Sequence, residues 1–526
     1  MDTDVLILGC GIAGATAALR LARNPARHVT LLSAASDPLE SNTGLAQGGI
    51  VAVDDDDTSL IDDIVRASGH TASPRAASVL TGQGGRLLRE VLVNAAPVGF
   101  DRGPDGALRL GLEGGHSRRR IAHVADGTGR AIATALMLAV AGRPNITLLT
   151  STAAIELITS SGTSERGARC RGAWVLDATG SVRPIVARAT IIATGGLAAS
   201  YLHTTNPPGA RGDGIAMAAR AGARTSGLEY VQFHPTALAV EGAGNFLISE
   251  AVRGEGAVLV GPGGRTFMHV YAPEWGDLAP RDIVSRAIDE QMLLHGVHHV
   301  HLDLASRMSP ERILARFPAI AQRCLEHGID ITHEAIPVRP AAHYTCGGIV
   351  VDAFGRSSVP GLYAVGEASN TGLHGANRLA STSLLEGLVW GATAADDIEA
   401  SLAGARADEA SDDPRRPSAC GDEQGESPSQ AIIDLNHEQL RDVMWHDVGL
   451  IRSATSLERA IGRLEAMRME ITALIAGWSP SVAAFGLRNA IEAALLVAQG
   501  ANRRRESTGC HFREDAPGTP LTAHRA

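Results

Sequence analysis

Residues 4–17 read DVLILGCGIAGATA, and this stretch indicates the fold class of the amino-terminal part of the chain. Four apolar residues at positions 5–8 predict a short buried strand, and the alanine-rich run after the glycines predicts a helix. Gly9 permits a tight turn, Gly11 lets a pyrophosphate approach the backbone, and Gly14 lets the helix pack closely on the strand. Because backbone amides at a helix start attract phosphate, the stretch predicts a dinucleotide-binding loop.

The second expected strand, at residues 28–32, argues against an ordinary nicotinamide enzyme. It ends in Ser-Ala-Ala-Ser, without the acidic residue that takes the ribose hydroxyls in such enzymes. A GxGxxG pattern alone is also a weak signal, because glycines occur in many strand-to-helix turns. The identity of the nucleotide therefore depends on other segments.

Length and charge exclude some classes of protein. The 526 residues are enough for about two or three domains with a large core. A net charge of −10 disfavours nucleic acid, so we interpret the arginine triplets at 118–120 and 503–505 as a solvated face or as anchors for carboxylates. The aspartates at 54–57 are expected to be solvated, and His298, His299 and His301 to lie on a partly exposed strand. We expect no metal site.

Targeting signals and cysteines suggest a compartment. The first strand begins within a few residues of the amino terminus, which leaves no room for a signal peptide. No apolar run is expected to approach the roughly 20 residues that cross a bilayer. The six cysteines form no CxxC pair, which is typical of reduced thiols. We therefore expect a cytoplasmic protein without a membrane partner.

Residues 40–50, ESNTGLAQGGI, are rich in glycine, amide and hydroxyl groups, which suits backbone laid against a flat ring system. With the first loop, this segment resembles the AQGG segment of the succinate dehydrogenase/fumarate reductase flavoprotein family, where it lines the isoalloxazine ring of FAD. Respiratory members carry a flavin-linking histidine four residues before the AQGG alanine, and here that position is Asn42. Since asparagine cannot form the bond, the resemblance implies non-covalent FAD.

Other segments resemble cofactor-binding segments of the same family, including ATGG at 193–196, RGDG at 211–214 and GLYAVGE at 361–367. The resemblance implies the following cofactor contacts in this chain: Gly9, Gly11, Ile12, Ala13, Gly14, Asn42, Thr43, Ala46, Gln47, Gly48, Gly49, Ala153, Ala154, Asp213, Glu367, Ser383 and Leu384.

Residues 229–236 (EYVQFHPT), 248–256 (ISEAVRGEG) and 278–284 (LAPRDIV) resemble the substrate motifs of the family. The resemblance implies that His234 and Gln232 bind substrate, that the hydroxyl of Ser249 holds a carboxylate where most relatives have threonine, and that Arg281 shuttles a proton. Because free arginine has a pKa above about 12, we expect an acidic neighbour to help Arg281, either Glu250 or Asp282.

Two further motifs follow these. RPAAHYTCGGI at 339–349 contains His343, which matches a second substrate histidine of the family, and GLHGANRLASTSL at 372–384 contains Arg378. A guanidinium grips a carboxylate through two parallel hydrogen bonds. Arg378 is therefore expected to bind a substrate carboxylate.

Residues 113–126, EGGHSRRRIAHVAD, resemble the L-aspartate oxidase branch of the family, whereas the dicarboxylate enzymes carry a different, glutamine-containing sequence. An amino-acid substrate brings a cationic amine, and Glu113 is a natural counter-charge for it. The alternative is that Glu113 is a surface loop residue. On the first interpretation, both carboxylates of L-aspartate are clamped, hydride passes to the flavin, iminosuccinate forms, and dioxygen or fumarate takes the electrons.

The resemblance implies an α/β fold: a Rossmann-like FAD-binding domain, an inserted α+β capping domain and a C-terminal helical domain. We expect the FAD-binding domain at 1–226 and 341–402, the capping domain at 227–340, a linker poor in large apolar residues at 403–430, and the helical domain and tail at 431–526. The tail motif RESTGCHFR at 505–513 should pack toward the flavin domain.

Two other functions stay open. The chain also fits a succinate dehydrogenase or fumarate reductase type of flavoprotein, and a flavin-binding protein without turnover is an alternative from another class. If aspartate is the substrate, the family role is the first step of de novo NAD synthesis, with quinolinate synthase as a possible partner that takes the product.

Overall fold

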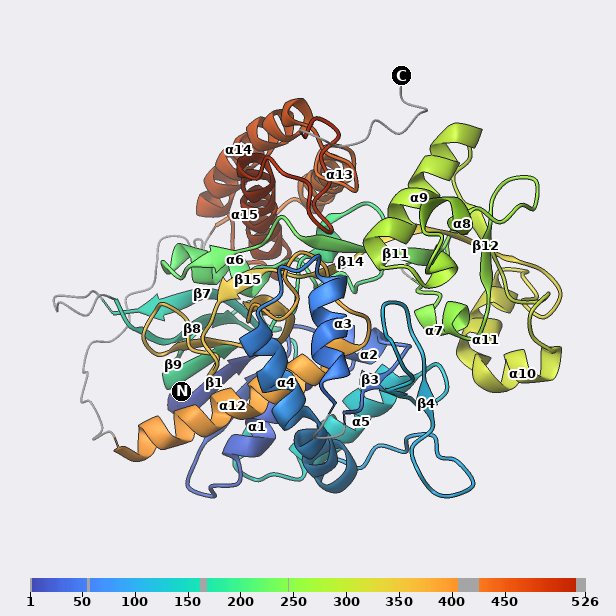
Figure 1. Ribbon diagram of the computed structural model, residues 1–526. Helices are drawn as coiled ribbons and strands as arrows, with labels where there is room; N and C mark the ends of the chain where they lie inside the picture. Colours follow the sequence, from blue (N-terminus) through green and yellow to red (C-terminus); the bar gives the residue numbers. More distant parts are fainter. Residues whose placement is uncertain (1, 54–56, 161–167, 245, 405–424, 517–526) are drawn as a thin grey trace.

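The computed structural model describes residues 2–53, 57–160, 168–244, 246–404 and 425–516. Figure 1 shows a large α/β lobe, a smaller lobe beside it that contains residues 231–345, and a group of C-terminal helices above the large lobe. We call these the flavin lobe, the capping lobe and the helical lobe. The fold class is the expected one.

The main sheet of the flavin lobe is built from β1 (Asp2–Leu8), β2 (Val29–Leu32), β6 (Ile146–Leu149), β7 (Ala153–Thr159), β8 (Cys170–Leu176), β9 (Val182–Ile192) and β16 (Leu362–Ala364). Its strand order is β6-β2-β1-β9-β8-β7, and β16 also pairs with β9. β1 pairs in parallel with β2 and β9, so the glycine loop that follows β1 lies at the carboxyl edge of the sheet. Ligands bind at this edge in open α/β folds.

Smaller elements complete the flavin lobe. The helices are α2 (Asn42–Leu45), α3 (Ser59–Ala67), α4 (Pro74–Leu87), a π-helix η1 (Leu88–Ala95), α5 (Thr128–Ala141), η2 (Ala198–Ser200), α6 (Asp213–Arg220) and η4 (Gly366–Ala368). The strands are β3 (Ile50–Val51), β4 (Leu110–Gly111), β5 (Ile121–Ala122), β10 (Thr225–Ser226), β15 (Gly348–Val350) and β17 (Ser369–Asn370).

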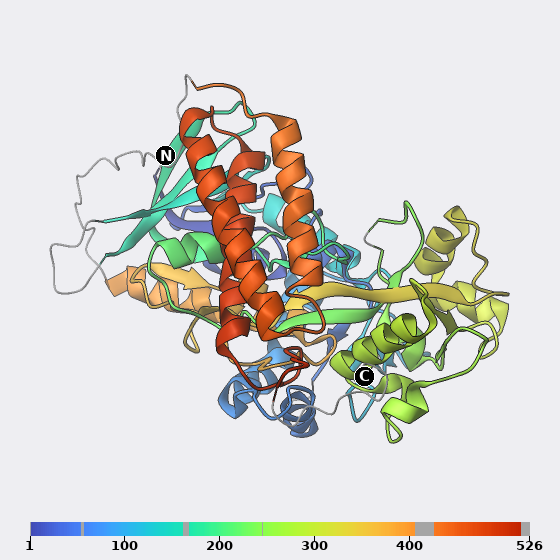
Figure 2. The same ribbon diagram turned by 90° about the horizontal axis from the view of Figure 1, so that it is seen from above.

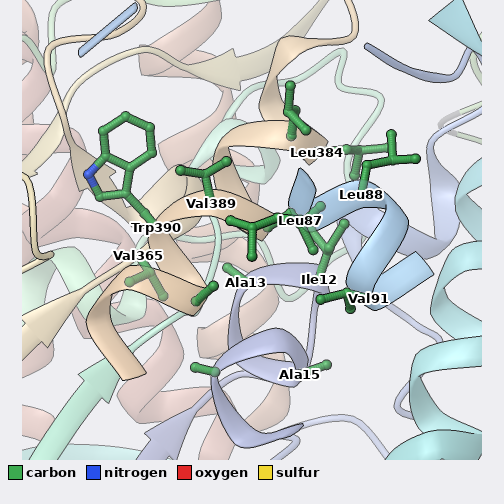
Figure 3. Packing of buried hydrophobic residues seen from close by; sticks show 14 of the residues in the cluster. Ile12, Ala13, Ala15, Leu87, Leu88, Val91, Val365, Leu384, Val389 and Trp390 are labelled. Atoms are coloured by element: carbon green, nitrogen blue, oxygen red, sulfur yellow. The ribbon is translucent and has the colours of Figure 1, made fainter. Parts of the chain in front are cut away.

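Helix α1 (Ile12–Leu21) packs against α12 (Thr382–Gly404) and α5, and Figure 3 shows its Ile12 and Ala13 in one apolar cluster with Leu87 and Leu88. Ala13 faces Gly387 and Gly391 of α12, and a Cβ atom on Gly387 would lie 3.4 Å from Cβ of Ala13. The two helices approach closely because α12 carries glycine at the crossing. A Cβ atom on Gly391 would lie 2.5 Å from the carbonyl oxygen of Ala13. This crossing fixes the helix that begins at the dinucleotide loop.

The capping lobe has its own sheet and core. Its sheet has the order β11-β14-β13-β12, formed by β11 (Val231–Leu238), β12 (Val258–Val260), β13 (Val300–Asp303) and β14 (Ile336–Thr345). Around it lie α7 (Glu250–Gly254), α8 (Met268–Tyr271), η3 (Gly276–Leu278), α9 (Arg281–His295), α10 (Pro310–Arg316) and α11 (Pro318–Glu326). Figure 2 shows β11 and β14 running from the flavin lobe into this lobe. The expected end of the capping domain, residue 340, therefore lies inside strand β14.

The helical lobe consists of α13 (Gln430–His446), α14 (Ala454–Gly477) and α15 (Val482–Arg503). We expected no apolar stretch of bilayer length, and this expectation is wrong for α15, which by length and composition alone is long and apolar enough. Most of its apolar stretch is buried in the protein, and core helices of soluble proteins pass the same test. Of the expected linker, residues 405–424 lie outside the described residues.

The tail packs as expected, because the amide of Cys510 donates to the carbonyl of Ala376 at 2.9 Å. The expectation that residues 54–57 are solvated is wrong for Asp57, which is buried and pairs with Arg118 and Arg120; residues 54–56 lie outside the described part. Arg120 does anchor carboxylates, since it also contacts Asp63 at 2.7 Å. Among the described residues, no cluster has the makings of a metal site.

The crossing of α1 and α12 can be tested with one methyl group. Gly391→Ala should lower the temperature of thermal unfolding by about 2 °C or more, because the new methyl group forces the helices apart. Gly82→Ala is the matched control, since Gly82 lies in helix α4 with open space around it. That change should leave the unfolding temperature unchanged or slightly raise it. Equal behaviour of the two variants would contradict the close crossing.

Candidate active site

A large cavity extends from the glycine loop to the base of the capping lobe, and most of the expected site residues line it. They are Gly9, Gly11, Ile12, Ala13, Asn42, Thr43, Ala46, Gln47, Gly48, Gly49, Glu113, Ala153, Ala154, Asp213, His234, Ser249, Arg281, His343, Glu367, Arg378, Ser383 and Leu384. Two expected residues, Gly14 and Gln232, do not line it.

The glycine loop forms one end of the cavity. Gly9 has φ +108°, and a Cβ atom there would lie 2.2 Å from the carbonyl oxygen of Ala193. Gly14 instead faces the loop itself, because a Cβ atom there would lie 2.0 Å from the carbonyl oxygen of Gly9. Helix α1 begins after Gly11, which has no side chain to cap it, and the amide of Ile12 donates to Oγ1 of Thr43 at 3.0 Å. The start of α1 at the cavity wall still suits a phosphate group.

Glu367 lies in the wall next to the glycine loop. Its carboxylate accepts hydrogen bonds from the amide of Thr345 at 3.0 Å and from Nδ2 of Asn42 at 2.9 Å. Burial raises the pKa of Glu367 to about 7. Oδ1 of Asn42 and Oε1 of Gln47 are buried without hydrogen-bond partners in the protein. Buried polar atoms normally have partners, so this wall is suited to a polar ligand.

Arg281, the first residue of α9, is held from behind by two side chains. Its Nε donates to Oε2 of Glu250 at 2.7 Å, and its Nη1 donates to Oε1 of Gln232 at 3.1 Å. Gln232 also donates to the carbonyl oxygen of Arg378 at 2.7 Å. Gln232, expected to contact substrate, thus connects the two arginines from outside the cavity.

Glu250 is the acidic neighbour of Arg281. Burial opposes its ionisation, but Arg281 and Arg253 lower its pKa to about 2, and the Arg253 pair measures 3.0 Å. The other candidate, Asp282, pairs with Arg286 at 2.8 Å instead. Glu250 is therefore an anion that fixes the Arg281 guanidinium.

The two histidines lie side by side, with ring centroids 5.1 Å apart. Burial, and then the charge of Arg281, lowers the pKa of both His234 and His343 well below the usual value, so both rings are neutral. Nδ1 of His234 accepts from the amide of Thr236 at 3.2 Å, which assigns its hydrogen to Nε2. That buried Nε2 has no partner in the protein and can donate to a ligand.

Arg378 and Ser249 supply further donors. The Arg378 guanidinium lies over the ring of Tyr344, 4.4 Å from its centroid, and donates to Oγ of Ser383 at 3.0 Å. Its Nε is buried without a partner. Ser249 caps helix α7 by accepting from the amide of Ala251 at 3.2 Å, which leaves its hydroxyl hydrogen available. These groups suit an anionic ligand.

Glu113 differs from these donors, because it is an acidic side chain. It is 3% exposed, so the alternative that it is a surface loop residue is wrong. Burial raises its pKa, and the nearby charge of Glu250 raises it further. Ser381, which has φ +56°, donates to Oε2 of Glu113 at 2.6 Å. Glu113 also reaches the AQGG loop, since a Cβ atom on Gly48 would lie 2.3 Å from its Oε1. A buried carboxyl thus lies among cationic groups.

Sequence reasoning missed several supporting residues. Arg253 lies one helical turn after Glu250, so the motif could have predicted the ion pair between them. Ser381 and Tyr344 lie in the two motifs from which only Arg378 and His343 were predicted as site residues. Thr205, whose hydroxyl lies 2.7 Å from Nδ1 of His343, is on a loop and carried no signal in the sequence.

Comparison with known families assigns the fold to a class. Residues 4–384 match the model of an FAD binding domain, and residues 437–520 match the model of the fumarate reductase flavoprotein C-terminus. A solved Escherichia coli quinol fumarate reductase chain is similar, with a TM-score of 0.87, 27% identity, and coverage of 100% of this chain and 93% of that chain. The chain therefore belongs to the succinate dehydrogenase/fumarate reductase flavoproteins, and its cofactor is FAD.

Within that family, the similar proteins in the L-aspartate oxidase branch cover nearly the whole chain. An L-aspartate oxidase 1 of Ralstonia nicotianae is 45% identical over 99% of this chain and 96% of its own length. An L-aspartate oxidase of Pseudomonas aeruginosa is 42% identical over 98% and 95%. One of Halobacterium salinarum is 41% identical over 98% and 96%.

The residues present fit FAD. The glycine loop and the start of α1 suit its pyrophosphate, and Asn42 and Gln47, which line the same cavity, each have a buried oxygen without a partner in the protein. At the opposite end, Gly48 of the AQGG loop approaches Glu113 and Ser249.

The geometry of the glycine loop predicts that a side chain at Gly9 weakens FAD binding. Gly9→Ala should lower the FAD content of the purified protein after dialysis, because the new methyl group collides with Ala193 and the positive φ disfavours any side chain. Gly106→Ala is the control, since Gly106 has φ +78° but open space around it. The ratio of flavin absorbance to protein absorbance measures the effect. Full FAD content in the Gly9 variant would refute this role of the loop.

Proposed function

We propose that this protein is an L-aspartate oxidase that converts L-aspartate to iminosuccinate with non-covalently bound FAD. The observation that carries the proposal is Glu113, a buried carboxyl in a cavity whose other charged groups include Arg281 and Arg378. A dicarboxylate without an amine gives that carboxyl no cationic partner. Asn42, which stands where a flavin-linking histidine would be needed, supports dissociable FAD.

The cationic end of the cavity suits the two carboxylates of aspartate. Arg378 offers a guanidinium with an unpaired Nε, and Arg281 is held in place by Glu250 and Gln232. Nε2 of His234 and the hydroxyl of Ser249 add neutral donors, which bind an oxygen without adding charge. Charge-assisted hydrogen bonds of this kind fix both the position and the orientation of a dianion.

Glu113 acts on the amino group. Its carboxylate pairs with the substrate ammonium, and the raised pKa suits it to accept a proton from that group. Removal of the proton frees the nitrogen lone pair, which favours departure of hydride from the adjacent carbon. Ser381 holds one carboxylate oxygen, so Glu113 keeps its orientation during this step.

Bound FAD supplies the two-electron acceptor that side chains lack. The capping lobe excludes water from the reaction, and contacts with the flavin lobe hold it in place. Asp126 of the flavin lobe accepts from the amides of Ala319 and Ile320 at the start of α11, at 3.2 and 2.8 Å. Nη1 of Arg316 donates to the carbonyl oxygen of Ala125 at 2.5 Å.

The electrons would end on dioxygen, with peroxide as the product, or on fumarate, with succinate as the product. Fumarate reduction needs a proton as well as a hydride, and we assign the proton transfer to Arg281, which donates to Glu250. We assign the protein to the first step of de novo NAD synthesis in the cytoplasm, without a membrane partner. Quinolinate synthase is the proposed consumer of iminosuccinate.

The assignment is tested by anaerobic mixing of the holoenzyme with substrate. L-aspartate should bleach the flavin absorbance of the wild-type protein, and Arg281→Leu should abolish the bleaching while FAD stays bound. Arg312→Leu is a control in the same lobe, because Arg312 is 68% exposed and lies outside the cavity. Undiminished bleaching of the Arg281 variant would remove that residue from the mechanism.

The same mixing distinguishes the alternatives. Bleaching by succinate but not by aspartate would indicate a succinate dehydrogenase type of flavoprotein. Stable FAD binding without bleaching by either compound would indicate a flavin-binding protein without turnover.

Glu113 predicts a pH dependence. The carboxylate form is the active form, so kcat/KM for aspartate should fall as pH decreases through the raised pKa of Glu113. His234 does not cause this decrease, because its pKa lies well below the usual value and it stays neutral. Glu113→Gln should remove that part of the profile and lower kcat/KM by about 10- to 100-fold. Glu274→Gln, at an exposed position, should leave the profile unchanged.

A further inference from the structure

A second cavity, of about 190 Å³, lies where the flavin lobe meets the helical lobe. Four polar residues line it: Ser200 at the end of η2, Arg211 in the loop before α6, and His437 and Arg441 on α13. Apolar side chains complete the wall. None of the four belongs to the active-site cavity.

Several donors in this second cavity have no partner in the protein. Ser200 is 2% exposed, and its buried Oγ makes no hydrogen bond. Nε of Arg211 is also buried and unpaired. Arg441 forms no ion pair with any residue that the structure describes. Buried donors without partners are uncommon in native proteins and call for a ligand.

The position of Arg211 is built into the fold. Its guanidinium lies against α15 at Gly486, where a Cβ atom would lie 2.3 Å from Cζ of Arg211. A larger residue at 486 would displace the guanidinium. On the other side, Nη2 of Arg211 is 3.4 Å from Oδ2 of Asp213, and Oδ1 of Asp213 accepts from Nδ2 of Asn489 at 2.9 Å.

The charges around the cavity are unbalanced. His437 and Arg441 are four residues apart on α13, so they lie on the same face of the helix. Asp213 and Asp434 are the acidic groups that act on His437, and Arg211 and Arg441 oppose them. Burial is the main cause that lowers the pKa of His437 to about 4, and each arginine lowers it more than either aspartate raises it.

We propose that this second cavity binds a phosphate-type anion, either inorganic phosphate or the phosphoryl group of a small phosphomonoester. Two guanidinium groups, a hydroxyl and an imidazole offer more donors than the two oxygens of one carboxylate can accept, whereas a phosphoryl group presents three or four oxygens. The volume leaves room beyond the anion itself. His437 and Arg441 are only half-buried, so the cavity is reachable from solvent.

The site borders the cofactor. Asp213 lines the active-site cavity, and Arg211 lines the second cavity. The ion pair between them connects the walls of the two cavities. An anion on Arg211 therefore binds one ion pair away from the FAD site. The proposal does not depend on the substrate of the enzyme.

Calorimetric titration of the holoenzyme with sodium phosphate, against sodium chloride at equal ionic strength, tests the site. Phosphate should bind saturably, and Arg441→Gln should weaken it about tenfold or more, as expected for the loss of a charged donor. Arg468→Gln is the matched control, because Arg468 is exposed on α14 and lies outside the cavity. Absence of saturable binding, or equal loss in both variants, would overturn the proposal.

Ser200→Ala gives an independent test that does not remove a charge. The unfolding temperature without phosphate should stay unchanged, because the hydroxyl has no partner in the protein. The phosphate affinity should fall severalfold. Glycerol phosphate, titrated in the same way, separates the two sources, since tighter binding than inorganic phosphate indicates a phosphomonoester. Unchanged phosphate affinity in the Ser200 variant would overturn the assignment of this cavity.

Discussion

The active site depends on one buried carboxylate, Glu250, which is shared between Arg281 and Arg253. A buried guanidinium is stable only when it is paired and hydrogen-bonded, because removing it from water is costly. Glu250 starts α7 and Arg281 starts α9, so the ion pair also joins two helices of the capping lobe. Glu250 therefore holds Arg281 in place, and the guanidinium can still direct its remaining donors to a ligand.

Two guanidinium groups, those of Arg281 and Arg378, lie at the substrate end of the cavity. Burial and then the charge of Arg281 lower the pKa of Arg378, and the two neutral histidines add no further charge. On the proposed function, a dianionic substrate would pair with these guanidinium groups, and Glu113 would pair with its amine. One electrostatic arrangement would then select both for two carboxylates and for a cationic group.

Much of this arrangement was predictable from the sequence, because local patterns encode it. The strand, glycine turn and helix of residues 4–17 obey short-range rules, and the motifs around His234 and Arg378 led to residues that line the cavity. The position of Gln232 was not predictable. Strand periodicity does not tell which of two polar neighbours reaches a cavity and which supports an arginine from behind.

The sequence also did not show which charged and apolar segments are buried in the fold. Asp57 looked solvated in its acidic run, but Arg118 and Arg120 pair with it. Helix α15 has an apolar composition because the helical lobe and α6 cover it, which only the tertiary structure reveals. Ser381 and Thr205 act through contacts between segments far apart in the chain, and no local signal marks such contacts.

Strands β11 and β14 pass without interruption from one lobe to the other, and their pairing shifts register between Gln232 and Phe233 and again between His234 and Ala237. A ribbon of paired strands resists the free rotation that a loop hinge allows, so any opening of the capping lobe must flex this ribbon, most easily at its irregularities. His234 lies between those two irregularities. Flexing of the ribbon at these points would move His234 relative to Arg378 of the flavin lobe, so the closed capping lobe and the assembled donor cluster depend on the same pair of strands.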